Sequence, residues 1–532
     1  MAITLNEIDA AEAWQPWQPR SNDPWNRKWA AHLYRRAAFG ASREDLLEAE
    51  RLGSQGTLDL LLRGMPQAEE LEETLVDIGR IAAERDDSGD QLRGWWLYCM
   101  LQGGHPLREK LTLFWHNHFA TSLAKVQSPA LMFRQNCLLR KHALGRFGPL
   151  LQAISRDGAM LLWLDSNSNV RGKPNENYAR ELMELFSLGV GHYTEKDVRE
   201  AARAFTGWRS DGASFTFDPR FHDDGSKTVL GQTGPWNGGD VVRIVLEQPA
   251  VARFLVRKLY RFLVSETPVP PDSLLEPLCQ SFRKSEYDTA ALVRTILASR
   301  HFYSKHAFRQ RVKGPVEYVL GAVQAVYRRY GEEEVHYRPL PPLALANRLS
   351  GMGQSLFAPP NVKGWPGGQA WLNTSTLLER DNFAAALAMG TLWASPAIEA
   401  SAAVGVASLT PAQGLGTAHS VLSIRKSSRP AALADAPEEP APPRAFDPAR
   451  IFEEGGGGVG RPAPQASARP TPSAEDIVQA LLDLYLPGGI RTELRAKLVA
   501  FVDEDKPAGP ALARRVREAV HAIVTMAEYH LA

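Results

Sequence analysis

The chain has 532 residues, of which 44% are hydrophobic and 23% charged, as is ordinary for a globular protein. Its 61 basic and 60 acidic residues give a formal charge of +1, so no overall field attracts it to nucleic acid or to an anionic membrane. Cys99, Cys137 and Cys279 are widely spaced in apolar stretches, which favours buried thiols over a disulfide framework. We therefore expect no nucleic-acid partner and a reducing compartment.

The N-terminal stretch MAITLNEIDAAEAWQPWQPR has no basic start followed by an apolar core, as an export signal would have. No later stretch offers about 18 uninterrupted apolar residues, so we expect no transmembrane segment. The absence of a signal peptide predicts a cytoplasmic location.

Helical spacing of apolar residues predicts a mainly α fold: one large multi-helix body with a small β-hairpin element. An N-terminal arm (1–28) precedes the main helical domain (29–398). Residues 399–472, rich in Ala, Pro and Gly, cannot bury enough apolar surface to offset their ordering entropy, so we expect a long disordered insertion. Helical periodicity returns in 473–532, and we expect these C-terminal helices to pack on the main domain.

Local signals mark helix starts and the hairpin. Ser42, Thr194 and Ser473 each precede a carboxylate by three residues, close to the capping-box pattern. Between residues 212 and 231, alternating phenylalanines followed by Asp-Gly and Gly-Ser turns predict a short strand or hairpin.

The stretch KLTLFWHNHFATS (110–122) places His116 and His118 one residue apart. Residues two apart on a helix are separated by about 200°, so the two rings point to nearly opposite faces and cannot chelate one ion. His118 falls on the apolar stripe, whereas His116 shares a face with Thr112 and Glu109. We favour a buried, hydrogen-bonded histidine at His118; the alternative is metal ligation with residues from elsewhere in the chain.

Charged residues follow the helix predicted in KPNENYARELMELFSLG (173–189). Glu176, Arg180 and Glu184 recur every four residues, which is typical of a surface ion-pair ladder. Glu181 and Glu184 are also spaced to hold a cation or to share a proton, although the Glu-x-x-His pattern of di-iron bundles is absent. The charged-face interpretation is favoured on this local pattern.

The loop RFHDDGSKTVLG (220–231) gathers polar groups around one turn. His222 and Asp223 are good ligands for a first-row metal, and Lys227 is suited to an anionic group. The alternative is an Asp-Gly turn with solvated charges.

A second loop, in LFAPPNVKGWPGGQAWLN (356–373), carries Trp365 and Trp371 among prolines and glycines. Such a rigid loop either braces a core or presents aromatic faces to a ligand, sugars included.

A series of stretches, in order, resembles a large bacterial family known only as a domain of unknown function numbered 1800. They are HLYRRAAFGASREDL, HPLREKLTLFWHNHFATS, NENYARELMELFSLGVGHYT, DVREAARAFTGW, FHDDGSKTVLG, VRKLYRFLV, PPNVKGWPGGQAWLN and AEYHLA. The resemblance spans nearly the whole chain from about His32, and it implies a mostly helical architecture. It brings no established activity, cofactor or catalytic residue.

The resemblance also implies a partner, since members are often encoded beside a second uncharacterised family that looks like sulfatases and alkaline phosphatases. Many members look exported, so the alternative to a cytoplasmic location is a periplasmic or exported protein that travels with a signal-bearing partner.

The first of three hypotheses is an enzyme or enzyme-like subunit with a divalent metal and hydrolytic or oxidative chemistry. Its metal ligands would come from His116, His118, His222 and Asp223. Its candidate catalytic groups are Glu176, Arg180, Glu181 and Lys227, and its candidate substrate contacts are Asn175, Trp365 and Trp371.

The second hypothesis is a non-catalytic subunit that binds the sulfatase-like partner or an extracellular polymer. The third is a sugar-polymer-cleaving enzyme that uses paired carboxylates with a tryptophan as stacking platform. The pattern of residues alone does not decide whether the protein is an enzyme.

Overall fold

The computed structural model describes residues 4–212, 214–325, 343–392 and 472–532. Within these residues the chain is mainly α-helical, as the sequence predicted, and its strands form two separate two-stranded hairpins. The insertion expected at 399–472 falls, except for its last residue, outside the described residues. Among the described helices, none is long and apolar enough to cross a membrane.

The helices as far as the hairpins are, in chain order, α1 (Ala10–Ala13), α2 (Arg27–Ala37), α3 (Arg43–Arg63), α4 (Ala68–Arg85), α5 (Asp90–Gln102), α6 (Pro106–His118), α7 (Leu123–Val126), α8 (Pro129–His142), α9 (Phe147–Ile154), α10 (Gly158–Trp163), α11 (Asn177–Glu181) and α12 (Glu195–Ala204). Strand β1 (Trp208–Ser210) pairs antiparallel with β2 (Phe215–Phe217), and β3 (Lys227–Val229) pairs antiparallel with β4 (Gln232–Gly234).

The later helices are α13 (Gly238–Leu246), α14 (Pro249–Leu263), α15 (Asp272–Lys284), α16 (Thr289–Ala298), α17 (Pro315–Gln324), α18 (Leu343–Gly351), α19 (Thr374–Ala388), α22 (Ala474–Tyr485), α23 (Thr492–Asp503) and α24 (Pro510–Thr525). Short 3-10 turns occupy η1 (Leu5–Glu7), η2 (Ser166–Ser168), η4 (Pro219–Phe221) and η6 (Gly368–Trp371).

The predicted capping boxes are confirmed at the starts of α3, α12 and α22. In each, the hydroxyl of Ser42, Thr194 or Ser473 accepts a hydrogen bond from the backbone N–H three residues on. The local sequence therefore sets where these helices begin.

The helix predicted within 173–189 is not a regular α-helix. After α11 it widens into a π-helix, η3 (Leu182–Ser187). Single π-turns inside helices are rare and are frequent at functional sites. Here the carbonyl groups of Leu185 and Phe186 accept hydrogen bonds from side chains of other helices instead of lying within a regular ladder.

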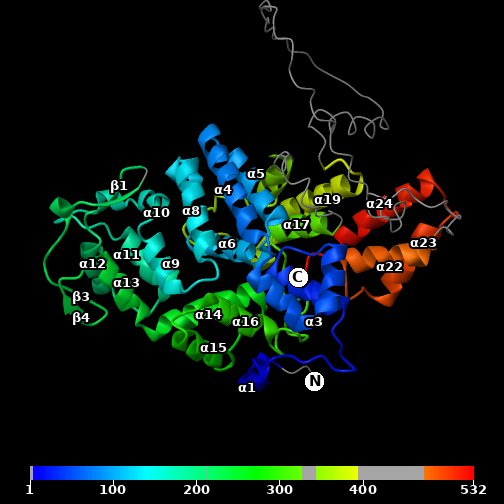
Figure 1. Cartoon of the computed structure of the whole chain (residues 1–532), viewed down its shortest axis with the longest axis horizontal. Coiled ribbons are helices and arrows are strands. Elements are labelled where there is room, and N and C mark those ends of the chain that lie inside the picture. The colour runs from blue at the N-terminus through cyan, green and yellow to red at the C-terminus, as the bar shows by residue number, and fades with distance from the viewer. Residues whose placement is uncertain (1–3, 213, 326–342, 393–471) are drawn as a thin grey trace, which may run out of the picture.

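Helix α6 lies between two hydrophobic cores. Leu111 and Trp115 belong to a core built mainly from α2, α9 and α12 to α16, and Leu113 belongs to a second core built from α5, α17 to α19 and α22 to α24. In Figure 1 the hairpins and α12 lie at one end of an elongated body, α23 and α24 at the other, and α6 near the middle. This central helix is therefore buried on nearly all sides.

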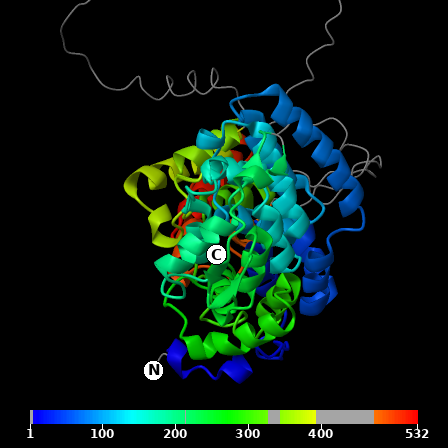
Figure 2. The same ribbon diagram turned by 90° about the vertical axis from the view of Figure 1, so that its left-hand side faces the viewer.

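The helices beyond residue 472 share the second core with the main body. Ile477 and Val520 are fully or almost fully buried in it, and Arg27 of α2 forms an ion pair with Asp483 of α22 at 3.1 Å. The end-on view of Figure 2 shows α19 and α24 (yellow and red) on the side opposite α4 (blue). Segments far apart in sequence thus meet around α2, α17 and α22.

Candidate functional site

His116 and His118 point to opposite cores, as the helical spacing predicted. The ring of His116 packs against Trp96 and Trp365, with centroids 5.1 and 5.6 Å away, and neither of its nitrogens has a hydrogen-bond partner in the described structure. Burial lowers the pKa of His116 to about 3, so the ring is neutral. The face that His116 shares with Thr112 and Glu109 is buried as well, so the apolar stripe of His118 is not the only buried face, because α6 lies between two cores.

His118 is the buried, hydrogen-bonded histidine that the sequence favoured. Its Nε2 lies 3.0 Å from the Phe186 carbonyl oxygen and its Nδ1 lies 3.0 Å from Nζ of Lys258. Lys258 also donates to the Leu185 carbonyl at 3.2 Å, so the π-helix is tied to α6 and α14 through these two side chains. Burial lowers the pKa of Lys258 to about 7.

Asn117, between the histidines, holds the tryptophan loop. Its Oδ1 accepts a hydrogen bond of 2.6 Å from the backbone N–H of Trp365, and a Cβ at Gly364 would lie 2.2 Å from that oxygen. Trp365 and Trp371 are only 5% and 7% exposed, so their rings brace the core and do not present a stacking surface to a sugar. The close approach of the loop therefore requires glycine at position 364.

The polar groups before and within α11 form local pairs. Arg180 donates to Glu176 at 3.0 Å, as the ladder predicted, and to Glu195 of α12 at 2.7 Å. Asn175 braces the preceding turn by donating to Ser168 Oγ at 2.8 Å. These contacts are typical of surface structure.

Two acidic side chains follow on the same helix. Glu184 accepts a hydrogen bond from Tyr193 at 2.8 Å rather than from Arg180. Glu181 is half-buried, and its burial, with a smaller contribution from Glu184, raises its pKa.

The loop 220–231 also satisfies its own polar groups. His222 Nδ1 lies 2.9 Å from the Thr206 carbonyl oxygen, Asp223 accepts from Arg203 at 2.8 Å, and Lys227 donates to the Asp223 and Gly225 carbonyls at 2.5 and 2.9 Å. The Arg203 hydrogen bond lowers the pKa of Asp223. Lys227 is thus a buried brace for the turn.

The structure brings only some of the polar stretches together: His118 contacts Phe186 and Asn117 contacts Trp365, whereas the pairs made by Glu176 and Asp223 are separate. Arg180, the partner of Glu176, also pairs with Glu195 at the start of α12, whereas Asp223 pairs with Arg203 near the end of the same helix. Glu195 and Arg203 are about 12 Å apart along the helix axis, since the rise is about 1.5 Å per residue. Within the described ranges no group of three or more His, Cys, Asp or Glu side chains is placed to hold a metal ion. The structure therefore does not support the divalent-metal site.

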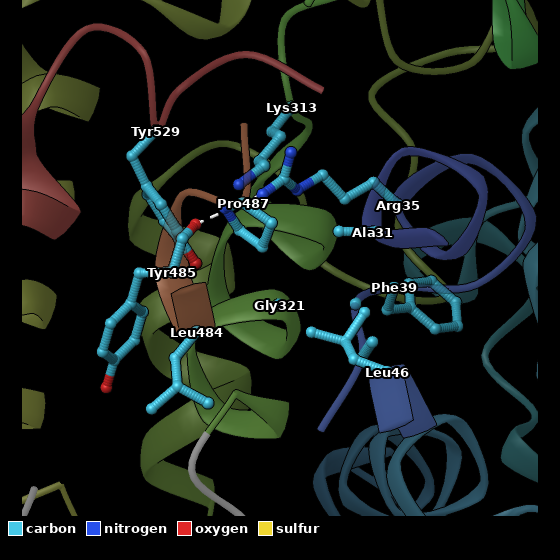
Figure 3. Close-up of a pocket in the computed structure, with 12 residues that line it drawn as sticks. Ala31, Arg35, Phe39, Leu46, Lys313, Gly321, Leu484, Tyr485, Pro487 and Tyr529 are labelled. Atoms are coloured by element: carbon cyan, nitrogen blue, oxygen red, sulfur yellow. Dashed lines mark hydrogen bonds between the residues drawn. The ribbon is translucent and has the colours of Figure 1, made fainter. Parts of the chain in front are cut away.

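A different set of side chains does converge (Figure 3). A small, partly open pocket, with room for about one water molecule, lies where α2, α17, the end of α22 and the segment after α24 meet. Its polar lining comes from Arg35, Lys313, Tyr485 and Tyr529. Arg35 and Lys313 are only 8% and 3% exposed, so two cations are buried at one small pocket.

Arg35 lies in the last turn of α2, where a cation is favoured by the helix dipole. One hydrogen bond is recorded for its guanidinium in the described structure, a long contact of 3.4 Å to the Tyr485 carbonyl oxygen. Burial and the nearby Arg309 lower the pKa of Arg35 to about 10. The guanidinium remains charged at neutral pH and keeps most of its donors free.

Lys313 lies in the extended segment before α17. Its backbone is fixed on both sides, because its N–H donates to the His530 carbonyl and its own carbonyl accepts from Arg380, each at 2.8 Å. Its Nζ lies 3.5 Å from the centroid of the Tyr529 ring, and no hydrogen-bond acceptor contacts it in the described part of the chain. Burial, and next Arg35, lower the pKa of Lys313 well below 10.5.

Two glycines allow the walls of the pocket to meet. A Cβ on Gly40 would lie 2.9 Å from Cα of Gly321, and a Cβ on Gly321 would lie 2.9 Å from the Phe39 carbonyl oxygen. Since real side chains do not tolerate such contacts, the chain after α2 can lie against α17 only with glycine at these positions. This approach brings Arg35 into the same pocket as Lys313.

The carboxylate of Glu317 is already paired with other side chains. Glu317 of α17 accepts hydrogen bonds from Lys110 and from Arg311, at 2.9 Å for one of the two Arg311 contacts. No ion pair joins Arg35 or Lys313 to a carboxylate anywhere in residues that the structure describes. The pocket therefore holds the positive charge of Arg35 without a directly paired carboxylate, and beside it the Lys313 amine, whose protonated form an anion would stabilise.

Sequence reasoning missed Arg35 and Lys313. The available signals were HLYRRAAFG and AEYHLA, two of the stretches that carry the family resemblance and that supply Arg35 and Tyr529. Lys313, between Val312 and Gly314, has no distinguishing local pattern.

A family model matches residues 32–531, nearly the whole chain, and its family is described as a protein of unknown function, DUF1800. No curated protein and no solved structure matches the chain. The matched region contains Arg35, Lys313, Tyr485 and Tyr529, so the pocket lies within the family domain. The chain belongs to the DUF1800 family.

Proposed function

We propose that this protein binds a small anion between Arg35 and Lys313 and functions as a binding protein rather than as a metal enzyme. The observation that carries the proposal is the presence of two buried basic side chains that line one pocket without a carboxylate partner in the described structure. This develops the second sequence hypothesis, a non-catalytic binding subunit. A sulfatase-like protein partner remains a separate proposal that rests on the family resemblance alone.

Energetics favour a bound anion over an empty pocket. Burying one charged side chain costs several kcal/mol unless a counter-ion and hydrogen bonds offset it. The Tyr529 ring offers Lys313 a cation–π contact of about 0.5–2 kcal/mol, and Arg35 has one long hydrogen bond. Without an anion, burial and the neighbouring Arg35 favour the neutral form of Lys313, whereas an anion would stabilise its protonated form and accept hydrogen bonds from both side chains.

The enzyme hypotheses have weaker support. Among the candidate carboxylates, Glu176 is paired with Arg180 at the surface, and Asp223 is paired with Arg203. Paired-carboxylate chemistry would have to use Glu181 and Glu184, and the tryptophans intended to hold a sugar are buried. Anion binding at Arg35 and Lys313 does not require any of the described ion pairs to break or either tryptophan to become exposed.

Thermal unfolding tests the proposal. Sodium chloride would be replaced stepwise by sodium acetate or sodium phosphate at constant ionic strength, for the wild type and for Lys313→Met and Arg35→Met. A ligand at about 100 times its Kd stabilises a protein by about 2.7 kcal/mol, so the wild-type Tm should rise. Neither variant should respond, because each loses one of the two cations.

The matched control is Lys305→Met, which removes an exposed lysine by the same substitution. It should respond to the anion as the wild type does. In anion-poor buffer Lys313→Met should be at least as stable as the wild type, since methionine carries no charge into the interior. A wild-type response retained in Lys313→Met and Arg35→Met would overturn the proposal.

A further inference from the structure

A lysine of α14 is held against His118 at the π-helix. Lys258 Nζ donates to His118 Nδ1 at 3.0 Å and to the Leu185 carbonyl oxygen at 3.2 Å. The ring of Phe254, one turn earlier on α14, has its centroid 4.8 Å from the same nitrogen. Lys258, Leu185 and Phe254 are each half-buried, so this side chain lies at the edge of the core rather than in its centre.

The hydrogen bonds fix which nitrogen of His118 is the acceptor. The Phe186 carbonyl oxygen, 3.0 Å from Nε2, has no proton to donate, so Nε2 carries the proton of the neutral ring. Burial, and next Lys258, lower the pKa of His118 well below 6.5, which keeps the ring neutral. Nδ1 therefore presents its lone pair to the Lys258 amine.

Two other buried lysines have different acceptors. Lys110 pairs with the Glu317 carboxylate, and Lys227 donates to two backbone carbonyls. Lys258 faces an imidazole nitrogen, and no carboxylate pairs with it in the described part of the chain. Burial, and next Arg261, lower the pKa of Lys258 to about 7, so about half of this amine is neutral at pH 7.

The neutral amine has its lone pair free. Its two N–H groups donate to His118 Nδ1 and to the Leu185 carbonyl, so the lone pair points away from both acceptors. Leu185 and the Phe254 ring flank the amine with apolar surface. A small molecule without charge meets less resistance there than a large or charged one, which would displace these side chains or lose its water.

A nucleophile within hydrogen-bond reach of a base, with the base oriented by a third group, is the arrangement that activates a side chain for covalent chemistry. Lys258, His118 and the Phe186 carbonyl supply these three parts. We propose that Lys258 reversibly forms an imine with a small uncharged aldehyde, with His118 as the base. This site is separate from the anion pocket, and the inference does not depend on it.

The reaction balances with the groups present. The lone pair of Nζ attacks the carbonyl carbon and forms a C–N bond, while the carbonyl π electrons move to the oxygen. His118 Nδ1 takes one amine proton and returns it to that oxygen, which gives a neutral carbinolamine. The oxygen then leaves as water with the second amine proton, and the C–N bond becomes the imine double bond. Hydrolysis reverses the sequence, so no oxidant or reductant is required.

Brief exposure of the full chain to acetaldehyde, followed by borohydride, tests the proposal. Reduction converts an imine into ethyl-lysine, which peptide mass spectrometry locates. At pH 7 an amine with a pKa of about 7 is neutral about a thousandfold more often than an ordinary lysine. Lys258 should therefore be ethylated at least about tenfold faster than the exposed Lys305, although Lys258 is half-buried.

The pH dependence and one variant test the role of His118. In the wild type, ethylation of Lys258 should level off above about pH 7, whereas that of Lys305 should still rise towards pH 10. His118→Gln retains a donor for the Phe186 carbonyl and an acceptor for Lys258, but it has no basic nitrogen. Since a positioned base contributes about a hundredfold or more, ethylation of Lys258 should fall at least about tenfold in this variant, with Lys305 unchanged.

Lys258→Gln should remove the label at this position and leave that of Lys305. Lys110 is an internal control, since it is fully buried and paired with Glu317 and should stay unlabelled. Ethylation of Lys258 no faster than that of Lys305, or equal labelling of Lys258 and Lys110, would overturn the proposal. So would an unchanged rate at Lys258 in a His118→Gln protein that unfolds cooperatively.

Discussion

Replacing Glu317 by glutamine tests the buried ion network beside the pocket. Glu317, on α17, accepts hydrogen bonds from Lys110 of α6, from Arg311 and from the backbone N–H of Gly314. The side chains of Lys110 and Arg311 are 0% and 5% exposed, so neither cation can recover water when its counter-ion is removed. The variant would leave two buried cations unpaired.

Two estimates of the magnitude agree. Removing one partner of a buried ion pair costs about 3–5 kcal/mol. Burial alone would raise the pKa of Glu317, but Arg311 and Lys110 outweigh it and lower the pKa from 4.5 to about 2. That difference corresponds to about 3 kcal/mol in the free energy of unfolding.

The pH dependence has a definite sign. Because the pKa of Glu317 is lower in the folded protein than in the unfolded chain, its contribution to stability is complete above about pH 4.5. It is lost as the pH falls from 4.5 towards 2. Glu317→Gln should therefore be less stable than the wild type at pH 7, and the difference should shrink below pH 4.

Urea unfolding at pH 7 gives the measurement, with Glu286→Gln as the control at an exposed ion pair. The control should change the free energy of unfolding by less than about 1 kcal/mol. A triple variant, Lys110→Met, Arg311→Met and Glu317→Leu, should recover much of the loss, since it removes all three charges. A Glu317→Gln protein within about 0.5 kcal/mol of the wild type would refute the reasoning.

Three further predictions concern the pocket and α6. Burial and nearby cations lower the pKa of Lys313, and a bound anion would raise it. Anion affinity should therefore fall as the pH rises through the pKa that Lys313 has in the free protein. The groups facing this lysine are Arg35, Arg380, Arg309, Glu317, Tyr529 and His530. Titrations in buffers of different ionisation enthalpy should show proton uptake on binding, and binding without pH dependence would contradict this. His116→Phe should leave the thermal stability unchanged or raise it, because both ring nitrogens of His116 lack hydrogen-bond partners. His118→Phe should lower the free energy of unfolding by about 1–3 kcal/mol, because the Phe186 carbonyl and Lys258 would each lose a hydrogen bond. A larger loss of stability in His116→Phe than in His118→Phe would be inconsistent with the structure. Asn117→Ala should also cost about 1–3 kcal/mol and speed hydrogen exchange at the Trp365 amide, and an unchanged exchange rate would argue against this contact.

Local features of the fold were predictable because their causes are local. The capping boxes at Ser42, Thr194 and Ser473 satisfy N–H groups within one helical turn, and the opposite directions of His116 and His118 follow from helical geometry. These predictions needed no knowledge of tertiary packing.

The burial of His116 and the pocket depended on long-range packing. Sequence periodicity identifies one buried stripe on a helix, but it does not reveal a helix such as α6 that lies between two cores. Likewise, Arg35, Lys313, Tyr485 and Tyr529 are separated by long stretches of chain, and only the packing of α2, α17 and α22 brings them together. The polar clusters were evident in the sequence, but their pairing with Arg203 and Glu195 was not.

A crystal structure of the full chain in sodium formate tests the central claim most directly. An omit map of the pocket should show one formate, with carboxylate oxygens about 2.7–2.9 Å from nitrogen atoms of Arg35 and Lys313. A pocket without ligand density at saturating formate, or one in which a carboxylate side chain of the protein itself pairs with both Arg35 and Lys313, would contradict the account.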